Sequence, residues 1–505
     1  MTRLLGIDVG TGGTRAVLLD ELGRVIGSAT SEHGPISARH TGWAEQHPHD
    51  WWRASCAAIK ECLERAATRA EDIAAIGLTG QMHGMVLLDG AGEVLRPAVI
   101  WCDQRTEEQC RAITEKIGAA RLIELTANPA LTNFTLTKIW WVQQHEPQVW
   151  SRVRTILLPK DYVRFKLTGA RAIDVADASG TLLFDVVHRR WSTEMMEASG
   201  IRHDQLPTAL ESPEISGRIS AEGSRATGLR AGTPVVAGAG DQAAGAVGIG
   251  IVRPGAVSAT IGTSGVVFAA TSAPTLDSKG RIHTFCHAVP GRWHVMGVTQ
   301  AAGYSLRWFR DELCRFGAES KLVSYDQLTT EAAATKPGAE GLLWLPYLMG
   351  ERTPHLDPDA RAALVGLTAQ HTRGHVVRAI LEGVAFSLRD TLTIFNELNL
   401  PVNSMRVGGG GARSPLWRQI QADIYGMPVE VLEAEEGAAY GAGLLAGVGA
   451  GVWQSVENAC DAAVRVAQQI QPEAATVPKM NRAYAEYRKL YPALRGIVHS
   501  AKGWS

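Results

Sequence analysis

Two stretches of the chain repeat one pattern, and this repeat constrains the fold more than any other feature of the sequence. Residues 4–19 (LLGIDVGTGGTRAVLL) and 256–270 (AVSATIGTSGVVFAA) each hold two apolar runs joined by a turn of glycine with threonine or serine. Each is typical of a β-hairpin whose tip is nearly bare of bulky side chains. One such hairpin in each half predicts two domains of one design, facing each other across a cleft.

Length and charge agree with this division. A chain of 505 residues is too long for a single hydrophobic core, and we place the boundary so that the domains are 1–250 and 251–505. Lys and Arg number 50 and Asp and Glu 51, and no basic run occurs, so we expect no nucleic-acid partner.

Residues 437–453 lack charge, but they are few and rich in glycine, which favours a helix buried against a sheet over a membrane span. The spacing of apolar residues predicts further helices over 50–67, 133–145, 300–313, 372–396 and 480–490.

The cysteines and the N-terminus indicate a compartment. Seven cysteines are scattered along the chain without a CxxC pair, which is typical of reduced thiols and favours neither a disulfide framework nor a zinc site. The N-terminal residues reach Asp8 too soon for a signal peptide. We therefore expect a cytoplasmic protein with no membrane partner.

The tip of the first hairpin has the chemistry of a phosphate site. Backbone N–H groups and threonine hydroxyls at a bare turn form a nest for phosphate oxygens. Asp8, just before the tip, is placed to hold a hydrated Mg²⁺ beside them. The alternative is a tight turn in which Asp8 is a plain hydrogen-bond acceptor. No Lys-Ser/Thr pair follows the glycines, so the turn is not a Walker loop.

A single carboxylate, Asp241, stands in a stretch of very small residues, 236–248 (VAGAGDQAAGAVG). Small side chains let a ligand approach the backbone closely, and an apolar setting makes an unpaired charge costly. Asp241 is therefore either an acid–base group of an active site or the N-cap of the helix that follows it.

Two further polar stretches interrupt apolar runs in the first half. GQMHG lies inside the strand–turn–strand pattern of residues 73–88, and it is a poor match to a simple hairpin turn. Its His83 is either a structural histidine or a ligand contact. A strand over 96–101 leads into Asp103 and Arg105, for which an internal ion pair is the favoured interpretation.

A glycine run precedes a helix start at residues 405–425 (MRVGGGGARSPLWRQIQADIY). Ser414 has the chemistry of an N-cap, and Pro415 suits the first helical position. Glycines before a helix N-terminus allow a nucleotide to lie against bare backbone. A flexible turn is the alternative, because a glycine pattern alone is weak evidence.

Together these stretches resemble the FGGY carbohydrate kinase family, and within it the bacterial xylulokinases. The resemblance covers nearly the whole chain, through GIDVGT, GQMHG, WCDQRT, GAGDQAAGAVG, IGTSG, GERTPHLDP, VRAILEGVAFSLRD and GGGGARSPLWRQIQAD in the family's order. Residues 362–382 match the C-terminal signature of the family. The N-terminal signature around Lys138 is met less closely, because Asn133 stands where a small or aromatic residue is usual.

The resemblance implies an α/β fold of duplicated actin-like, ribonuclease H-like domains around a central cleft, each with a mixed five-stranded sheet. It implies an ATP-dependent kinase that converts D-xylulose to D-xylulose 5-phosphate with Mg²⁺, with the sugar bound by domain 1–250 and the nucleotide by 251–505. Asp241 would be the catalytic base, and Asp8 would support catalysis by holding Mg²⁺ through a bound water. The sugar would contact Met82, His83, Asp241 and Gln242. The nucleotide would contact Thr11, Gly12, Gly13, Arg15, Gly262, Thr263, Gly303, Arg307, Gly409, Gly410 and Ser414.

The substrate is the least constrained part of this expectation. Met82 and His83 match xylulokinases, whereas Gln242 follows the catalytic aspartate as in glycerol kinases, in place of the usual asparagine. Ribulose, glycerol and sugar alcohols are therefore alternative substrates. An actin-like ATPase without a sugar substrate is a more distant alternative, because it needs neither GQMHG nor an acid facing a sugar pocket. A homodimer is common among the relatives that the resemblance points to.

Overall fold

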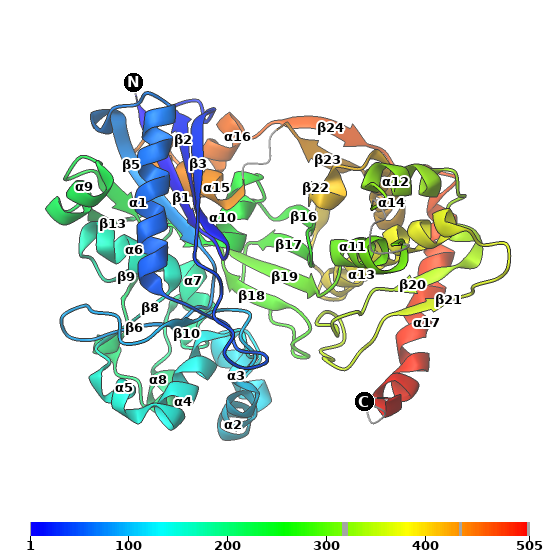
Figure 1. Ribbon diagram of the computed structural model, residues 1–505, viewed down its shortest axis with the longest axis horizontal. Coiled ribbons are helices and arrows are strands. Elements are labelled where there is room, and N and C mark those ends of the chain that lie inside the picture. The colour runs from blue at the N-terminus through cyan, green and yellow to red at the C-terminus, as the bar shows by residue number, and fades with distance from the viewer. Residues whose placement is uncertain (1, 316–321, 434–436, 502–505) are drawn as a thin grey trace.

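The computed structural model describes residues 2–315, 322–433 and 437–501, and its strands form one large sheet in each half (Figure 1). The strands of the first sheet are β1 (Arg3–Val9), β2 (Gly13–Asp20), β3 (Val25–Glu32), β5 (Ile73–Gly80), β13 (Ile215–Arg218), β14 (Pro234–Val236) and β15 (Ala239–Gly240). Those of the second are β16 (Gly255–Ile261), β17 (Gly265–Thr271), β18 (His283–Cys286), β19 (Trp293–Thr299), β22 (Val402–Gly409), β23 (Val429–Leu432) and β24 (Val466–Ile470).

The two sheets share one topology. The first runs β13-β14-β5-β1-β2-β3 with β15 also on β5, and the second runs β18-β19-β17-β16-β22-β23-β24. In each, a three-stranded antiparallel unit (β1-β2-β3, β16-β17-β19) continues into two parallel strands (β5 and β14, β22 and β23). The repeat of residues 4–19 in 256–270 is thus a duplication of the fold, and the predicted fold class is confirmed. Within the described ranges each sheet has seven strands: β13 at the edge and β15 on β5 join the expected five in the first sheet, and the edge strands β18 and β24 join them in the second.

Helices cover both sheets and form most of the remaining structure. Those of the first half are α1 (Pro48–Arg65), α2 (Glu107–Ile117), α3 (Ala119–Thr126), α4 (Thr135–His145), α5 (Pro147–Arg152), α6 (Pro159–Thr168), α7 (Val175–Ser179), α8 (Thr193–Ser199), α9 (Ala221–Thr227) and α10 (Asp241–Gly248). Those of the second half are α11 (Gly303–Trp308), α12 (Tyr325–Ala333), α13 (Arg373–Glu397), α14 (Pro415–Tyr425), α15 (Gly437–Gly449), α16 (Val456–Ala463) and α17 (Val477–Ala501). Four of the helices predicted over 50–67, 133–145, 300–313, 372–396 and 480–490 form as α-helices, and α17 is longer than expected. Of residues 300–313, only α11 is α-helical, and Phe309–Leu313 continue as a π-helix.

Short strands connect the segments outside the two main sheets. They are β4 (Glu45–Gln46), β6 (Val86–Leu88), β7 (Ala98–Val99), β8 (Thr155–Leu157), β9 (Ala172–Asp174), β10 (Phe184–Asp185), β11 (Arg190–Trp191), β12 (Thr208–Leu210), β20 (Leu343–Leu345) and β21 (Ala363–Val365). The strand–turn–strand pattern of 73–88 is not a hairpin, since β5 pairs with β1 and β6 pairs with β8. The strand expected over 96–101 is reduced to β7, because Pro97 has no N–H to give to a ladder.

Helix α15 joins the halves at the bottom of the cleft. It packs against β1 and β5 of the first sheet and against α10. A Cβ added to Gly6 or Gly77 would overlap the carbonyl oxygen of Ala439 or Ala442, so these glycines allow the close helix–sheet contact. The prediction of a buried helix here is confirmed. Because α15 lies between β23 and β24 of the second sheet in sequence and packs on the first sheet, the division at residue 250 stays a prediction.

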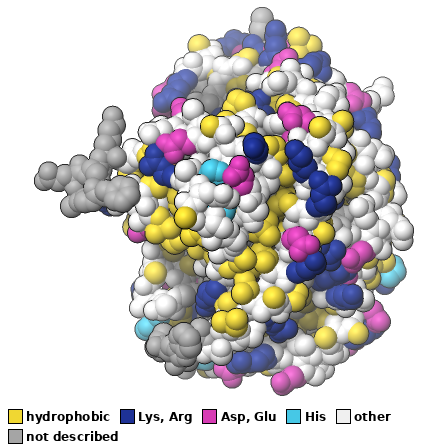
Figure 2. All heavy atoms as spheres, turned by 90° about the vertical axis from the view of Figure 1, so that its right-hand side faces the viewer, with side chains coloured by type: hydrophobic (Ala, Val, Ile, Leu, Met, Phe, Trp, Pro, Cys, Tyr) yellow, Lys and Arg dark blue, Asp and Glu magenta, His cyan; other side chains and the backbone are white. Residues whose placement is uncertain are grey.

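One hydrophobic cluster crosses between the halves below the cleft. It combines Phe134 and Ile139, from the start and middle of α4, with Phe268 and Phe285 of the second sheet. On the side of α17, apolar side chains gather in a band between charged ones (Figure 2). Among the described residues, no helix is both long and apolar enough to cross a bilayer.

Candidate active site

Two carboxylates meet where three parallel strands of the first sheet end. Ala239 of β15 pairs with Thr79 of β5, and Thr79 pairs with Asp8 of β1. Asp241 follows β15 directly, so the topology brings it to the edge at which Asp8 lies. Carboxyl ends of parallel strands are the usual place for ligands in open α/β sheets.

Asp241 is the first residue of α10, and Gly240 holds the N-cap position without a side-chain capping bond. The interpretation of Asp241 as a helix cap is therefore wrong. Its carboxylate accepts hydrogen bonds from the N–H and the side chain of Gln242. It is partly accessible and lines a cavity of about 330 Å³ between the halves.

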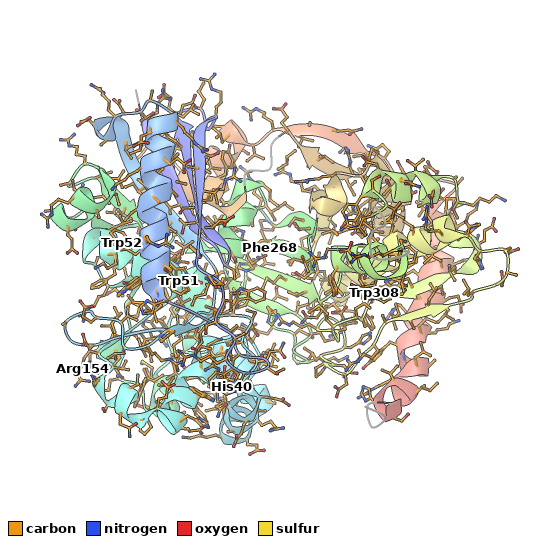
Figure 3. The ribbon with its side chains drawn as sticks, in the orientation of Figure 1. His40, Trp51, Trp52, Arg154, Phe268 and Trp308 are labelled. Carbon is orange, nitrogen blue, oxygen red and sulfur yellow. The ribbon has the colours of Figure 1, made fainter. Side chains whose placement is uncertain are left out.

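The wall of this cavity opposite Asp241 comes from the second sheet. It includes Ser258, Thr260 and Gly262 near the end of β16, and Val266 and Phe268 on one face of β17. Phe268 lies in the middle of the molecule, between the two halves (Figure 3). The sequence analysis did not select it, although alternation along β17 places it on the same face as Val266.

The electrostatic environment brings the pKa values of both carboxyl groups close to neutral pH. Burial raises the pKa of Asp241 to about 6, in spite of the hydrogen bonds from Gln242. Burial and the charge of Asp241 raise the pKa of Asp8 to about 7, and Arg15 opposes the shift. Arg15 is the partner of Asp8 across the hairpin. Such a pair of carboxyl groups is typical of a functional site.

The residues around Asp8 fit a divalent cation. Its Oδ1 is buried and accepts no hydrogen bond from the described residues. An oxygen ligand of this kind suits Mg²⁺, which prefers carboxylates and water. A cation would also relieve the repulsion between Asp8 and Asp241.

The two hairpin tips are held in shape by their own backbones. In the first, the N–H of Gly10 donates to the carbonyl of Gly13 at 3.0 Å, and the Thr11 hydroxyl accepts from the Trp101 indole at 2.9 Å. A Cβ added to Gly12 would meet no atom within 4 Å, so this tip is open. In the second, the N–H of Gly262 donates to Ser264 at 2.9 Å.

A second cavity, of about 430 Å³, lies in the second half. It brings together six of the residues predicted to bind nucleotide: Gly262, Thr263, Gly303, Arg307, Gly410 and Ser414. Gly409 does not line it, but its positive φ of 70° shapes the turn into the cavity. Thr11, Gly12, Gly13 and Arg15 belong to the first hairpin and lie outside it. Gly262 lines both cavities, so the two meet there.

The helix start in this cavity is the predicted one. The Ser414 hydroxyl accepts from the N–H of Trp417 at 3.3 Å, and Pro415 is the first helical residue of α14. The N-terminus of α14 therefore presents backbone N–H groups and a positive dipole end beside the cavity.

Met82 and His83 are buried next to the strand end that carries Asp241. A Cβ on Gly240 would lie 2.8 Å from Cγ of Met82. His83 Nδ1 lies 2.7 Å from the carbonyl oxygen of Gly180, which assigns the proton to Nδ1 and leaves Nε2 as an acceptor. Burial lowers the pKa of His83 to about 3, so the ring is neutral. Both of the earlier interpretations of His83 therefore stay open, since one nitrogen is structural and the other can accept.

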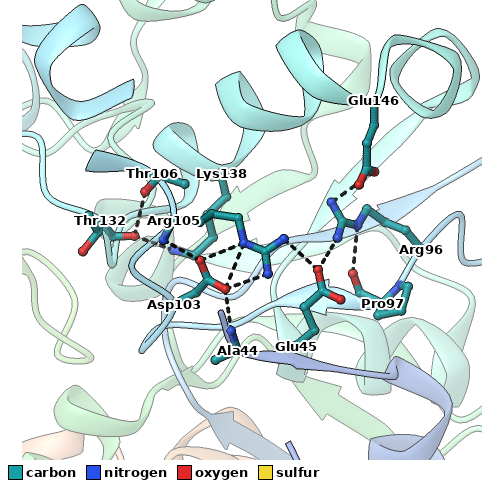
Figure 4. A network of polar contacts seen from close by, with 10 residues as sticks. All are labelled: Ala44, Glu45, Arg96, Pro97, Asp103, Arg105, Thr106, Thr132, Lys138 and Glu146. Atoms are coloured by element: carbon teal, nitrogen blue, oxygen red, sulfur yellow. Dashed lines mark hydrogen bonds and ion pairs between the residues drawn. The ribbon is translucent and has the colours of Figure 1, made fainter. Parts of the chain in front are cut away.

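Asp103 and Arg105 form the expected internal ion pair (Figure 4). The Arg105 guanidinium also contacts Glu45 at 2.8 Å and lies 3.6 Å from the centroid of the Trp43 ring. Every charge in this network has a protein partner, so the WCDQR motif contributes to the fold here.

A buried charge cluster next to Gly240 was not predicted. Lys160 Nζ lies 2.6 Å from Asp161 and Asp174 and 2.8 Å from Asp177, all unexposed. The Asp177 Oδ1 atom lies 3.0 Å from the position of a Cβ on Gly240. No local pattern signals the cluster, because its members come from α6, β9 and α7.

Comparison with known proteins shows the family to which the chain belongs. Residues 3–248 match the model of the FGGY family of carbohydrate kinases, N-terminal domain, and residues 257–450 match that of the C-terminal domain. A xylulose kinase of Bacillus subtilis is 40% identical over 504 residues, covering 100% of this chain and 99% of the relative. A xylulose kinase of Escherichia coli is 38% identical, covering 98% of this chain and 99% of the relative.

Solved structures of related proteins have the same fold as this chain. A crystal structure of a "xyloylose kinase" from Brucella ovis superposes with a TM-score of 0.91 at 35% identity, covering 98% of this chain and 100% of that one. The crystal structure of a xylulose kinase from Rhodospirillum rubrum has the same TM-score at 31% identity and the same coverage.

Proposed function

The chain belongs to the FGGY family of carbohydrate kinases, and we propose that it transfers the γ-phosphoryl group of ATP to D-xylulose, giving D-xylulose 5-phosphate. Full-length similarity to proteins named xylulose kinase supports the substrate. The observation that carries the proposal is the Asp241 carboxylate, which is partly accessible in a cavity that meets a second cavity at Gly262. Acceptor and phosphate donor can therefore approach each other at this point.

In this proposal the nucleotide occupies the larger cavity. Its adenosine part contacts Gly303, Arg307, Gly409, Gly410 and Ser414. Its phosphates lie between the two hairpin tips and contact Thr11, Gly12, Gly13, Arg15, Gly262 and Thr263. Backbone N–H groups at such tips stabilise the charge of the phosphates without reorganisation during the reaction.

Asp8 would hold Mg²⁺ through a bound water. The orphaned Oδ1 atom and the raised pKa of Asp8 support this role. When bound, Mg²⁺ neutralises charge on the phosphoryl group that is transferred.

Asp241 acts as the general base. With a pKa of about 6 it is mainly ionised at pH 7 and still basic enough to take a proton. The hydroxyl oxygen on C5 of the sugar attacks the γ-phosphorus, the bond from that phosphorus to the bridging oxygen breaks, and the hydroxyl proton passes to Asp241. Closure of the halves would align the two substrates and exclude water.

The sugar lies against residues at the same strand ends. Met82 packs beside Gly240, the Nε2 atom of His83 accepts a hydrogen bond from a sugar hydroxyl, and the Gln242 amide reaches the same cavity as Asp241. We also infer a cytoplasmic location, which the seven unpaired thiols support. The homodimer stays a prediction.

The decisive experiment is a coupled assay of ADP release with a panel of acceptors: D-xylulose, D-ribulose, glycerol, xylitol and gluconate. We expect the highest kcat/KM with D-xylulose. A higher value with any other acceptor would contradict the substrate. ADP release that is the same with and without every acceptor would contradict the sugar kinase and indicate an ATPase of another kind.

A further inference from the structure

Arg352, in the loop between β20 and β21, lies beside the sugar side of the cleft. Its neighbour Thr353 occupies the edge of β19, where its N–H donates to Val298 and its hydroxyl accepts from the same residue, both at 3.0 Å. On that same edge His283 is the partner of Met296. Met296 and Val298 are two positions apart on β19, so Thr353 and His283 follow one another along this edge, and Arg352 precedes Thr353 in the chain.

A chain of ring contacts connects His283 with His83, the proposed sugar contact of the first half. Its ring centroid lies 5.8 Å from that of Phe134, which lies 5.0 Å from that of His83. The charge of Arg352 also contributes to lowering the pKa of both histidines, after burial. The loop therefore brings a cation of the second half toward His83.

Arg352 is partly accessible, and its guanidinium differs from that of the buried Arg164 in having no partner among the described residues. Within the described ranges it forms neither a hydrogen bond nor an ion pair, although burial lowers its pKa. Glu351 does not neutralise it by contact, since its Oε1 atom accepts the N–H groups of Gln300 at 3.0 Å and of Arg352 at 2.7 Å. By contrast, Arg105 is bound by two carboxylates. A partly accessible guanidinium without a protein partner keeps its N–H donors available, and a ligand oxygen would satisfy them.

The chemistry of the proposed substrate indicates which of its oxygen atoms accepts a hydrogen bond from Arg352. In the furanose form of D-xylulose the C5 oxygen is part of the ring, so transfer to it requires the acyclic ketose. That form has hydroxyls, which donate and accept, and one carbonyl oxygen at C2, which only accepts. Asp241 and His83 Nε2 are acceptors and suit hydroxyls, whereas a guanidinium only donates.

We propose that Arg352 is a specificity-determining residue that donates a hydrogen bond to the C2 carbonyl oxygen of the acyclic ketose. The proposal rests on the proposed function. It makes the second half a part of sugar recognition, and it predicts discrimination between a ketose and the sugar alcohol that lacks the carbonyl.

The test compares kcat/KM for D-xylulose and for xylitol in the wild type and in Arg352→Met. We expect a loss of about 10- to 100-fold with D-xylulose, mostly through KM, because a charge-assisted hydrogen bond is removed. With xylitol we expect less than about threefold, and no change in the KM for ATP. Arg352→Lys, which keeps a donor, should recover part of the loss.

Arg361→Met is the matched control, since Arg361 is exposed on the same loop and donates only to local carbonyl groups. It should match the wild type with both acceptors. Equal losses with ketose and alcohol in Arg352→Met, at an unchanged melting temperature, would overturn the inference, as would no loss at all.

Failure of the proposed function has a different signature. If the wild type prefers D-ribulose, the loss of kcat/KM in Arg352→Met is compared for D-ribulose and for its sugar alcohol. A larger loss with the ketose supports the inference, and equal losses overturn it. If the wild type prefers gluconate and Arg352→Met removes that preference, the guanidinium binds a carboxylate, and both proposals are wrong.

Discussion

Two groups of carboxylates within the first half, one buried and one partly accessible, differ in how their charge is balanced. Asp161, Asp174 and Asp177 are unexposed and surround the Lys160 ammonium within 2.8 Å. Asp8 and Asp241 are partly accessible, and Asp241 lines a cavity between the halves. The only opposing charge that acts on this second pair, among the described residues, is Arg15, and it acts on Asp8.

The pKa values reflect this difference. Burial opposes protonation of Lys160, yet the three carboxylates hold its pKa above the usual range, so the cluster is balanced internally. Burial raises the pKa of Asp8 and Asp241 to about 7 and about 6, because the chain supplies too little positive charge. We therefore expect the first group to act on the stability of the fold and the second to be completed by a ligand.

The largest expected effect concerns Asp241. Asp241→Asn should keep the fold and the affinity for sugar but lower kcat by about 10²–10⁴, since an amide cannot take the proton. Steady-state ADP release with saturating D-xylulose measures this. A purified variant that retains more than about a tenth of wild-type kcat would show that Asp241 is not the general base.

Lys160→Met should act on stability. Removing the ammonium leaves three carboxylates without a counter-charge, which we expect to reduce the free energy of unfolding by about 3–5 kcal/mol. Carboxyl groups whose pKa is raised in the folded state destabilise it as pH rises through that pKa, so the deficit should be larger at pH 8 than at pH 5. Denaturant unfolding of the wild type and of Lys160→Met at both pH values tests whether the loss of unfolding free energy increases with pH. A deficit that does not depend on pH would mean that lost packing, not unbalanced charge, is the cause.

Asp8→Asn should raise the concentration of Mg²⁺ needed for half-maximal activity by about 10- to 100-fold, the range seen for groups that act on a metal through its shell. Titration of Mg²⁺ at fixed ATP measures it. Asp103→Asn serves as a control, because Asp103 is saturated by Arg105; it should lower the melting temperature without a change in the Mg²⁺ requirement. An unchanged requirement in Asp8→Asn would contradict the metal role.

The raised pKa of Asp241 predicts the pH profile. Below about pH 6 Asp241 is protonated, so kcat/KM should fall about tenfold per unit; it should become level only above about pH 7, where Asp8 is ionised as well. More Mg²⁺ should move the inflection to lower pH, because a cation stabilises the ionised pair. An inflection near pH 4, as for an exposed aspartate, would show that Asp241 is well solvated.

The smallest effect is expected from Gln242→Asn, which introduces the residue usual in xylulokinases. The shorter amide leaves Asp241 and the cavity intact, so kcat/KM for D-xylulose should change by less than about threefold. The acceptor panel used for the wild type measures any change of preference. A switch of preferred acceptor would show that Gln242, not Met82 and His83, selects the sugar.

Much of the fold was predictable from local patterns. The repeated hairpins predicted the duplicated architecture, since two apolar runs around a glycine-rich turn pair with each other whatever surrounds them. The cap at Ser414 and the ion pair of Asp103 with Arg105 were predictable for the same reason, as both partners are close in sequence. Local patterns could not decide between the two roles considered for Asp241, because an aspartate at the start of a helix suits both an N-cap and an acid–base group.

Residues that act across long separations in sequence were missed. Phe268 lines the Asp241 cavity only because the second sheet faces the first, and Lys160 finds its partners only when α6, β9 and α7 converge. Likewise the GERTPHLDP segment was recognised as a motif, but nothing local indicates that Arg352 lies near His83.

The amino-acid sequence alone determined the family, the two-domain design and the identity of the residues at each turn, because short-range hydrogen bonding and the alternation of apolar residues are encoded locally. The tertiary structure decided which charges are balanced by the chain and which are left for a ligand. That outcome depends on burial and on distances between segments far apart in the chain, and these exist only once the two halves have packed together.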